Sequence, residues 1–282
     1  MWFVAGSILT NVLLLVWLRL FRVPVFPLIT LNYWVCVGWV TLLEPPNWEQ
    51  VASISGWAIG AFFLLGGLFI SVFALTGAAT REIGIGLVGM LAKLSVVFPV
   101  AFSAFFMKEP LSFFQQLGVL IGLGAIVAVH YPYLRGGGWR ALFRAGRIGI
   151  LLWIGNGIID ILFKAFQPHW VSLSPLQIPL FIMSVAGALG VFFHLGRGKG
   201  SLLLHRSTLG TAVILGTTNL LSIYCYLKGL QSFPAVQFFL WNNLGIVLLS
   251  GIVGVLFFRE RFSWEMGVGY GMGLLSIFLV SA

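Results

Sequence analysis

Residues 84–112, GIGLVGMLAKLSVVFPVAFSAFFMKEPLS, decide the fold. They form one apolar run long enough to cross a hydrocarbon core of about 30 Å, which takes about 20 residues of helix. A single lysine, Lys93, lies near the middle of the run, and Lys108 with Glu109 closes it. Because a charge at that depth is costly, the stretch predicts a membrane-spanning helix whose lysine faces protein or a water-filled cavity.

The composition of the whole chain favours the same class. Of the 282 residues, 60% are hydrophobic and 8% are charged, whereas charged residues make up about a quarter of a soluble protein. Backbone groups in lipid must be satisfied within helices or a closed barrel, and these runs do not alternate as barrel strands do. The sequence therefore predicts an all-α integral membrane protein. It contains no GxxxxGK[ST] phosphate loop, so ions or substrate gradients are expected to drive any transport.

Ten apolar segments are separated by breaks that carry Pro, Gly or charge. They cover approximately residues 2–18, 26–43, 57–77, 83–106, 112–129, 148–166, 175–194, 208–227, 234–257 and 264–281. We therefore expect ten transmembrane helices joined by short loops.

The segments fall into two similar sets of five. Residues 108–112, KEPLS, align with residues 259–263, RERFS, at a shift of 151 residues. At the same shift the GxxxG pair Gly118 and Gly122 falls on Gly269 and Gly273, a spacing that favours close helix packing. The first segments also match, since Asn11 falls on Asn156 at a shift of 145.

An odd number of spans makes the second set enter the membrane from the opposite side, so the two repeats are inverted. We divide the chain into a first five-helix repeat over 1–130, a basic connecting loop over 131–147 and a second five-helix repeat over 148–282. Inverted repeats are an architecture of secondary transporters, in which substrates bind near the midplane between the halves.

Basic residues set the expected orientation, because they favour the cytoplasmic side. Those that follow the odd-numbered segments are Arg19, Arg22, Arg81, Arg135, Arg140, Arg144, Arg147, Arg197, Lys199, Arg206, Arg259 and Arg261, and the other side has Lys108, Lys228 and Lys164. We expect a multi-pass protein of the bacterial inner membrane with both termini outside. The net charge of +9 is attributed to this topology and not to binding of nucleic acid.

The chain also resembles a known family. The segments that carry the resemblance are the two repeats, each with a (Lys/Arg)-Glu step before a Gly-rich fifth helix, together with residues 11–21, 31–33 (LNY) and 73–77 (FALTG). They are similar to the drug/metabolite transporter (DMT) superfamily, in particular its EamA-like members. The resemblance implies metabolite export or exchange through a cavity formed by the first, third, fourth, sixth, eighth and ninth segments, with the fifth and tenth packed away. Many relatives are thought to keep both termini in the cytoplasm; we follow the charge count.

Two charges inside apolar segments are the first candidates for the site. Lys93 could bind a substrate carboxylate or phosphate or exchange protons, and the structural alternative is an ion pair. Asp160 is the acid placed well inside a helix, on one stripe with Asn156 and Lys164. It could hold a coupling proton or a substrate ammonium, or it could pair with Lys164 or Lys93.

Further candidates are uncharged. Asn11 and Asn156 occupy matching positions in the two repeats, and Asn219 and Tyr226 are seven residues apart on one helical face. Trp241, Asn242 and Asn243 lie where the first repeat is apolar, but three consecutive residues sweep about 200° and cannot all face one cavity. At least one of these asparagines is expected to bond a neighbouring helix, as intramembrane amides often do.

The sequence thus predicts a secondary active transporter of a small polar or amphipathic metabolite, with protons as a candidate coupling ion, no cofactor and no metal. The alternatives are a lipid flippase or an uncoupled channel on the same scaffold. We do not expect an enzyme, because intramembrane catalysis would need grouped acids or histidines. The acids are scattered and the histidines stand apart, at 130, 169, 194 and 205.

Overall fold

A computed structural model describes residues 1–46, 48–106, 108, 111–135, 139–198, 200–259 and 263–281, and over these residues every regular element is helical. The α-helices are α1 (Trp2–Leu20), α2 (Val25–Leu43), α3 (Trp48–Ala52), α4 (Gly56–Ile83), α5 (Ile85–Lys93), α6 (Val97–Phe105), α7 (Phe113–Arg135), α8 (Trp139–Phe166), α9 (Gln177–Gly196), α10 (Arg206–Ser232), α11 (Ala235–Phe258) and α12 (Trp264–Ser281). Three 3₁₀ segments join them: η1 (Leu94–Val96), η2 (Gln167–Trp170) and η3 (Gly200–Leu204).

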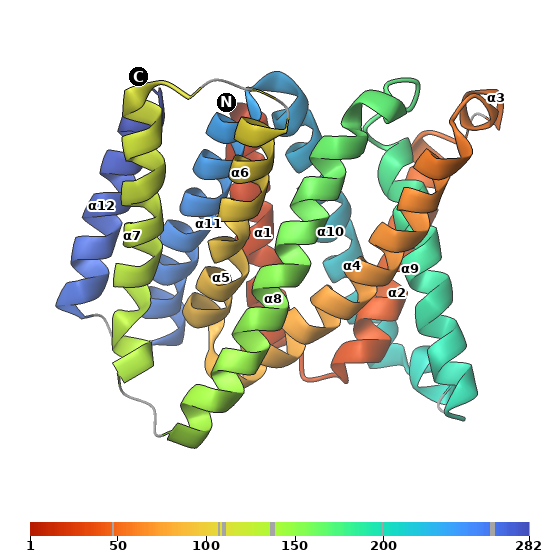
Figure 1. The fold of residues 1–282 in the computed structure, drawn as a ribbon. Helices are drawn as coiled ribbons and strands as arrows, with labels where there is room; N and C mark the ends of the chain where they lie inside the picture. The colour runs from red at the N-terminus through yellow and green to blue at the C-terminus, as the bar shows by residue number, and fades with distance from the viewer. Residues whose placement is uncertain are drawn as a thin grey trace.

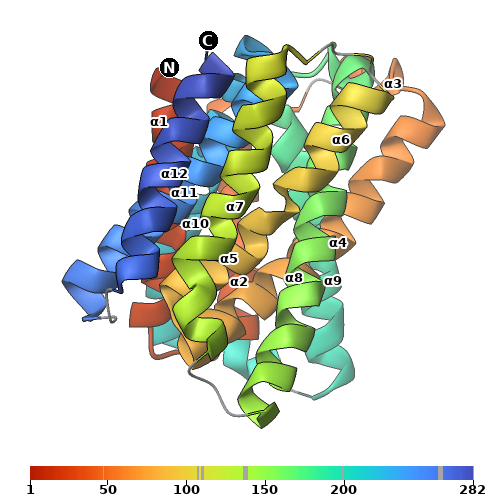
Figure 2. The ribbon, with the colours of Figure 1, turned by 60° about the vertical axis from the view of Figure 1, so that its left-hand side comes forward.

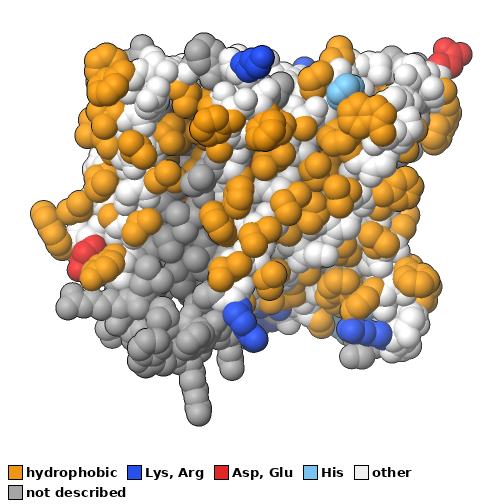
Figure 3. Space-filling model, in the orientation of Figure 1, with side chains coloured by type: hydrophobic (Ala, Val, Ile, Leu, Met, Phe, Trp, Pro, Cys, Tyr) orange, Lys and Arg blue, Asp and Glu red, His pale blue; other side chains and the backbone are white. Residues whose placement is uncertain are grey.

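Seven of these helices contain apolar segments long enough to cross a membrane, counted over the described part of the chain: α1, α2, α4, α8, α9, α10 and α11. Large hydrophobic side chains cover the middle of the outer face, while the Lys and Arg side chains in that view lie at its upper and lower edges (Figure 3). Over the described residues, exposed large hydrophobic side chains include Phe192 and Leu42, each 78% exposed. Such a surface suits contact with lipid, so the prediction of an all-α membrane protein is confirmed at this level.

The long helices run side by side from one end of the bundle to the other, and both chain ends lie at the same end (Figure 1). α1 packs against α10 and α11, α2 packs against α9 and α10, and α4 packs against α8 and α9. α7 and α12 form a pair at one side of the bundle, which both views show (Figures 1 and 2).

Small residues let α7 and α12 approach closely, as the GxxxG spacing predicts. The Ser276 hydroxyl donates to the Gly118 carbonyl at 2.6 Å. A Cβ placed on Gly122 would lie 2.7 Å from Ser276 Oγ, so a larger residue there would push the helices apart. At the start of α7, Ser112 and Gln115 bond each other's backbone N–H and form a capping box.

One predicted helix is broken in the structure. The segment predicted over 83–106 consists of α5, the 3₁₀ turn η1 and α6, so the helix is interrupted directly after Lys93. Pro99 explains the break, because it has no N–H for the carbonyl of Ser95 and its ring clashes with that carbonyl. The Ser95 hydroxyl adds to the irregularity by bonding back to the Ala92 carbonyl at 2.7 Å.

One other expectation needs correction. The connecting stretch predicted as a loop over 131–147 is helical in its described residues, because α7 continues to Arg135 and α8 begins at Trp139; Arg and Ala are good helix formers. Two prolines of the apolar segments lie at helix starts: Pro179 is in the first turn of α9 and Pro234 precedes α11 as its N-cap. Proline is tolerated at such positions, so neither kinks a helix.

The ends of α6 and α11 share an unusual backbone conformation. Lys108, shortly after α6, and Arg259, directly after α11, both have φ of 54°. Positive φ is uncommon for residues other than glycine. Glu109, Glu260, Arg261 and Phe262 of the aligned motif lie outside the described residues.

Candidate functional site

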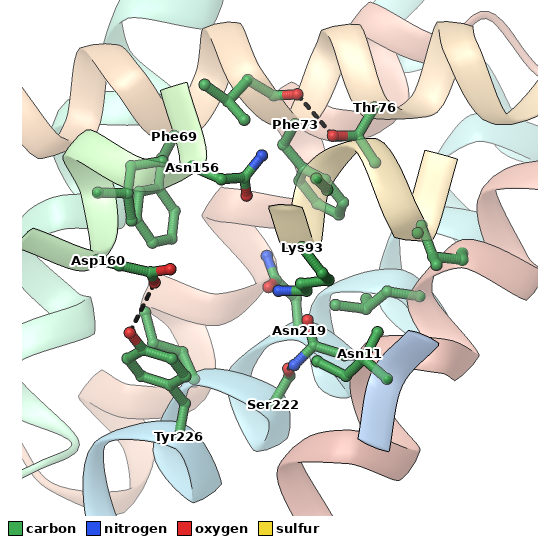
Figure 4. Close-up of a pocket in the computed structure, with 18 of the residues that line it drawn as sticks. Asn11, Phe69, Phe73, Thr76, Lys93, Asn156, Asp160, Asn219, Ser222 and Tyr226 are labelled. Carbon is green, nitrogen blue, oxygen red and sulfur yellow. Dashed lines mark hydrogen bonds between the residues drawn. The ribbon is translucent and has the colours of Figure 1, made fainter. Parts of the chain in front are cut away.

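A cavity of about 170 Å³ lies in the interior of the bundle (Figure 4). Six helices line it: α1, α4, α5, α8, α10 and α11. The lining residues are Asn11, Leu14, Leu15, Phe69, Val72, Phe73, Thr76, Gly89, Ala92, Lys93, Asn156, Ile159, Asp160, Phe163, Asn219, Ser222, Ile223, Tyr226 and Ile246. These helices correspond to the six segments that the family resemblance names, and none of the lining residues comes from α7 or α12.

Two opposite charges face the cavity from different helices. Lys93 comes from α5 and Asp160 from α8, and they lie on different sides of the space (Figure 4). They attract each other electrostatically, but the described contacts include no ion pair between them. The space between the charges can therefore admit a ligand or water.

The backbone around Lys93 suits a positive charge. Lys93 is the last residue of α5, and the C-terminal end of a helix carries a partial negative charge from its unpaired carbonyls. Because η1 breaks the helix there, this favourable end lies inside the bundle. Gly89, one turn earlier, also lines the cavity, and a Cβ placed on it would lie 2.7 Å from Ser250 Oγ, so the glycine lets α5 pack closely against α11.

Asp160 is held by a tyrosine. The Tyr226 hydroxyl of α10 donates to Asp160 Oδ1 at 2.7 Å, and only 8% of Asp160 is exposed. Of the partners considered from the sequence, neither Lys164 nor Lys93 supplies this bond. One bond occupies only part of the accepting capacity of a carboxylate, so Asp160 can still bind a proton or a cationic group.

The remaining polar lining residues are anchored to the helices. Asn11 Nδ2 donates to the Ser222 hydroxyl on α10 at 2.8 Å. Asn219 Nδ2 donates to Asn32 Oδ1 on α2 at 3.1 Å. Asn156 Nδ2 donates to the Leu152 carbonyl of its own helix at 2.7 Å. These bonds fix the amides in place, so the cavity presents a defined set of polar groups.

The structure does not bring Trp241, Asn242 and Asn243 into the cavity wall. Asn242 is fully buried and its Oδ1 accepts the Ser7 hydroxyl of α1 at 2.8 Å, so it bonds a neighbouring helix as the sequence predicts. Asn243 is 1% exposed, and Trp241 packs against Phe233 with ring centroids 5.2 Å apart. The α11 residue that reaches the cavity is Ile246.

Sequence reasoning missed Ser222, Thr76 and three phenylalanines. Ser222 lies three residues after Asn219 and four before Tyr226, so the helical face of those two candidates already contained it. Phe73 and Thr76 belong to the segment that supported the family resemblance, yet nothing local marked them as lining. Phe69 and Phe163 have no sequence signal, because phenylalanine is common throughout membrane helices.

No cluster of His, Cys, Asp or Glu that could hold a metal ion occurs in the described ranges of the chain. Cys36 and Cys225 are both buried and free. The chemistry of the cavity is therefore that of one cation, one carboxylate, several amides and hydroxyls, and aromatic walls.

A bacterial protein and a solved structure are similar to this chain. An uncharacterized protein of Haemophilus influenzae (strain ATCC 51907 / DSM 11121 / KW20 / Rd) is 31% identical over 221 residues, which cover 77% of this chain and 73% of that protein. A solved structure described only as a crystal structure of a protein has a TM-score of 0.71 and 17% identity, over 99% of this chain and 95% of that chain. At that identity the likeness concerns the fold alone. No family model matches the chain.

Proposed function

The chain belongs to the same family as the uncharacterized Haemophilus influenzae protein, and we propose that it is a secondary transporter that moves a small polar or amphipathic metabolite by alternating access. The observation that carries the proposal is the pair Lys93 and Asp160, which face one interior cavity without a direct ion pair. Charged groups at membrane depth are costly, so they are rarely retained without a partner or a pathway to serve.

The broken helix beside the cavity supports the same proposal. In many transporters the substrate and ion sites lie near the midplane, where helices are discontinuous and their ends point at the ligand. Here α5 ends at Lys93 inside the bundle. A carboxylate or phosphate of the substrate would bind Lys93, and an ammonium or a coupling proton would bind Asp160.

We further propose that the chain forms ten transmembrane helices in two inverted five-helix repeats and belongs to the DMT superfamily as an EamA-like member. The shared φ of 54° at Lys108 and Arg259 supports a repeat, because these residues align at the shift of 151. An even number of crossings also agrees with two chain ends at one end of the bundle (Figure 1).

The location that accompanies this function is the bacterial inner membrane, with both termini outside. A reporter fused to the C-terminus should therefore show activity outside the cytoplasm. A cytoplasmic signal would reverse the orientation while leaving the transporter proposal intact.

Release of metabolites from vesicles tests the function. Purified protein in liposomes loaded with a defined mixture of amino acids, nucleosides and small organic acids should release one or a few components faster than protein-free liposomes, as measured by mass spectrometry. If none is released while the protein remains folded, the proposal fails for these classes. Movement of a fluorescent phospholipid instead would favour a flippase.

Asp160→Asn tests proton coupling with the released component as substrate. The amide oxygen can still accept the Tyr226 bond, so the main change is loss of the negative charge. We expect substrate-dependent proton movement to disappear, whereas Glu44→Gln, at the end of α2 and outside the cavity lining, should retain it. Persistent proton movement in Asp160→Asn would remove the coupling role from this residue.

A further inference from the structure

One side chain separates the cavity from a second, smaller pocket. Phe163 of α8 lines both and is 3% exposed. The second pocket has a volume of about 10 Å³. Its lining residues are Phe163, Gln167, Trp170, Ile178, Leu227, Leu230 and Gln231. They come from the C-terminal parts of α8 and α10, from η2 and from the start of α9, so the pocket lies toward one end of the bundle.

We propose that Phe163 and Tyr226 form a gate between the cavity and this end of the protein, and that Asp160 holds the gate closed through Tyr226. The inference rests on the proposed function, because a gate requires a molecule that passes. It assigns a role in transport to Phe163, which binds no polar group and has no marker in the sequence.

Aromatic side chains pack between the cavity and the second pocket. The ring centroids of Phe163 and Tyr226 are 5.7 Å apart, those of Phe69 and Phe163 are 5.9 Å apart, and those of Phe163 and Trp170 are 6.4 Å apart. Beyond this layer lies Gln231, which is exposed at the end of α10. Rotation of the Phe163 side chain would therefore connect the cavity with the small pocket without movement of a whole helix.

Asp160 links the gate to the charged site. It lies three residues before Phe163 on α8, so both occupy one helical face. Its bond from the Tyr226 hydroxyl, 2.7 Å long, holds the tyrosine ring beside Phe163. A cationic group that binds Asp160 partly neutralises the carboxylate that accepts the Tyr226 bond, which weakens that bond, so ligand binding acts on one of the two gate residues.

Aliphatic residues pack at the opposite end of the cavity. Six residues form an aliphatic cluster there, two of which, Leu15 and Val72, belong to the cavity wall. Its members are Leu15, Val72, Ala79, Ile85, Val88 and Leu152. Arg81 of α4 also donates to the carbonyls of Leu18, Phe21 and Val23, which ties the end of α1 to α4. Opening that end would break these three bonds, whereas the aromatic end needs a side-chain movement.

Thiol labelling tests the gate without any transported substrate. The protein, with Cys36 and Cys225 replaced by alanine, receives a reporter Ile223→Cys in the cavity wall. The separate variant Gln231→Cys identifies the side of the vesicle on which the second pocket lies. The probe is a small anionic methanethiosulfonate reagent that does not cross the membrane, applied to sealed vesicles of either orientation.

In the reporter background, Phe163→Ala should raise the labelling rate of Ile223→Cys by about tenfold or more, because local opening controls the access of a buried group. The increase should occur only from the side on which Gln231→Cys reacts. Phe166→Ala is the matched control, since Phe166 lies one turn further on α8 and stacks on Trp170, but lines neither pocket. It should leave the rate unchanged.

Tyr226→Phe keeps the ring but removes the bond to Asp160, so we expect a smaller increase from the same side. If Phe163→Ala does not fold, Phe163→Leu replaces it in the labelling experiment. Tyr226→Phe then serves as a second, independent test of the gate. An unchanged rate in the folded Phe163 variant, an equal increase with Phe166→Ala or an increase from the opposite side would overturn the gate. Because labelling needs no substrate, a failed gate and a failed transport proposal are distinguishable.

Discussion

The broken segment α5–η1–α6 and the continuous helix α11 align in sequence at the shift of 151, yet they use their polar residues differently. The broken segment contributes Gly89, Ala92 and Lys93 to the cavity. α11 contributes Ile246, although it contains two adjacent asparagines in its first half. One of them, Asn242, is bonded to Ser7 of a neighbouring helix.

The difference shows that a polar residue at membrane depth does not by itself mark a site. The oxygen of an amide can accept a hydrogen bond from a hydroxyl of a neighbouring helix, at an average gain of about 0.6 kcal/mol, and the side chain can then be buried away from the cavity. A lysine costs about 2.5 to 3.5 kcal/mol at the centre of a helix in the membrane and needs water, a counter-charge or a helix end. The break after Lys93 provides the helix end, and the cavity provides the space.

The largest expected effect comes from removing the charge on the broken segment. Lys93→Met keeps the length of the side chain and removes the ammonium, so efflux from liposomes should fall to the level of protein-free vesicles. The thermal midpoint should not fall, because a buried charge no longer has to be accommodated. Lys228→Met near the end of α10 is the control and should retain efflux, since Lys228 is not among the lining residues. Full efflux in folded Lys93→Met would make the lysine structural.

A smaller effect is expected from repairing the break itself. In Pro99→Ala the new N–H can bond the Ser95 carbonyl, and a proline inside a helix costs about 3 kcal/mol relative to alanine. We therefore expect a higher thermal midpoint and efflux that is several-fold slower, because the segment loses its hinge. Pro179→Ala, in the first turn of α9 where the N–H has no helical partner, should change neither property. Unchanged efflux with a higher midpoint would show that the break serves packing only.

The charged residues of the cavity can be predicted from the sequence, whereas the position of the helix break and the burial of Asn242 cannot. Lys93 and Asp160 can be found because a charge in an apolar run is rare. Pro99 predicts a disturbed helix but not that the disturbance falls directly after Lys93, because that also depends on the back-bonding of Ser95. The sequence does not distinguish Asn242 from the asparagines that line the cavity, because its burial depends on a bond to Ser7, which is 235 residues away in sequence.

The same limit applies to the cavity wall. Asn11, Asn156, Asn219 and Tyr226 are predictable as polar residues on helical faces, and all four line the cavity. Phe163 separates two hollows only because α8, α10 and η2 converge around it. No periodicity along a single helix contains that information, since it arises from packing between segments distant in the chain.

The smallest expected effect concerns the asparagine of the continuous helix, and it tests whether this region is structural. Ser7→Ala leaves the carbonyl oxygen of buried Asn242 without its donor and should lower the free energy of unfolding by about 1 kcal/mol. Asn242→Leu should lower the free energy of unfolding by less, because it removes an Nδ2 group that already lacks a partner in the described part of the chain. When Ser7 and Asn242 are both replaced by apolar residues, the change in stability can be nearly zero. The double variant should therefore be more stable than Ser7→Ala alone, with a coupling energy of about 0.6 to 1.7 kcal/mol in a double-mutant cycle measured by denaturant titration. All three variants should retain efflux. If Asn242→Leu abolished efflux at unchanged stability, the continuous helix would act on the substrate as the broken one does, and the distinction between the two regions would be lost.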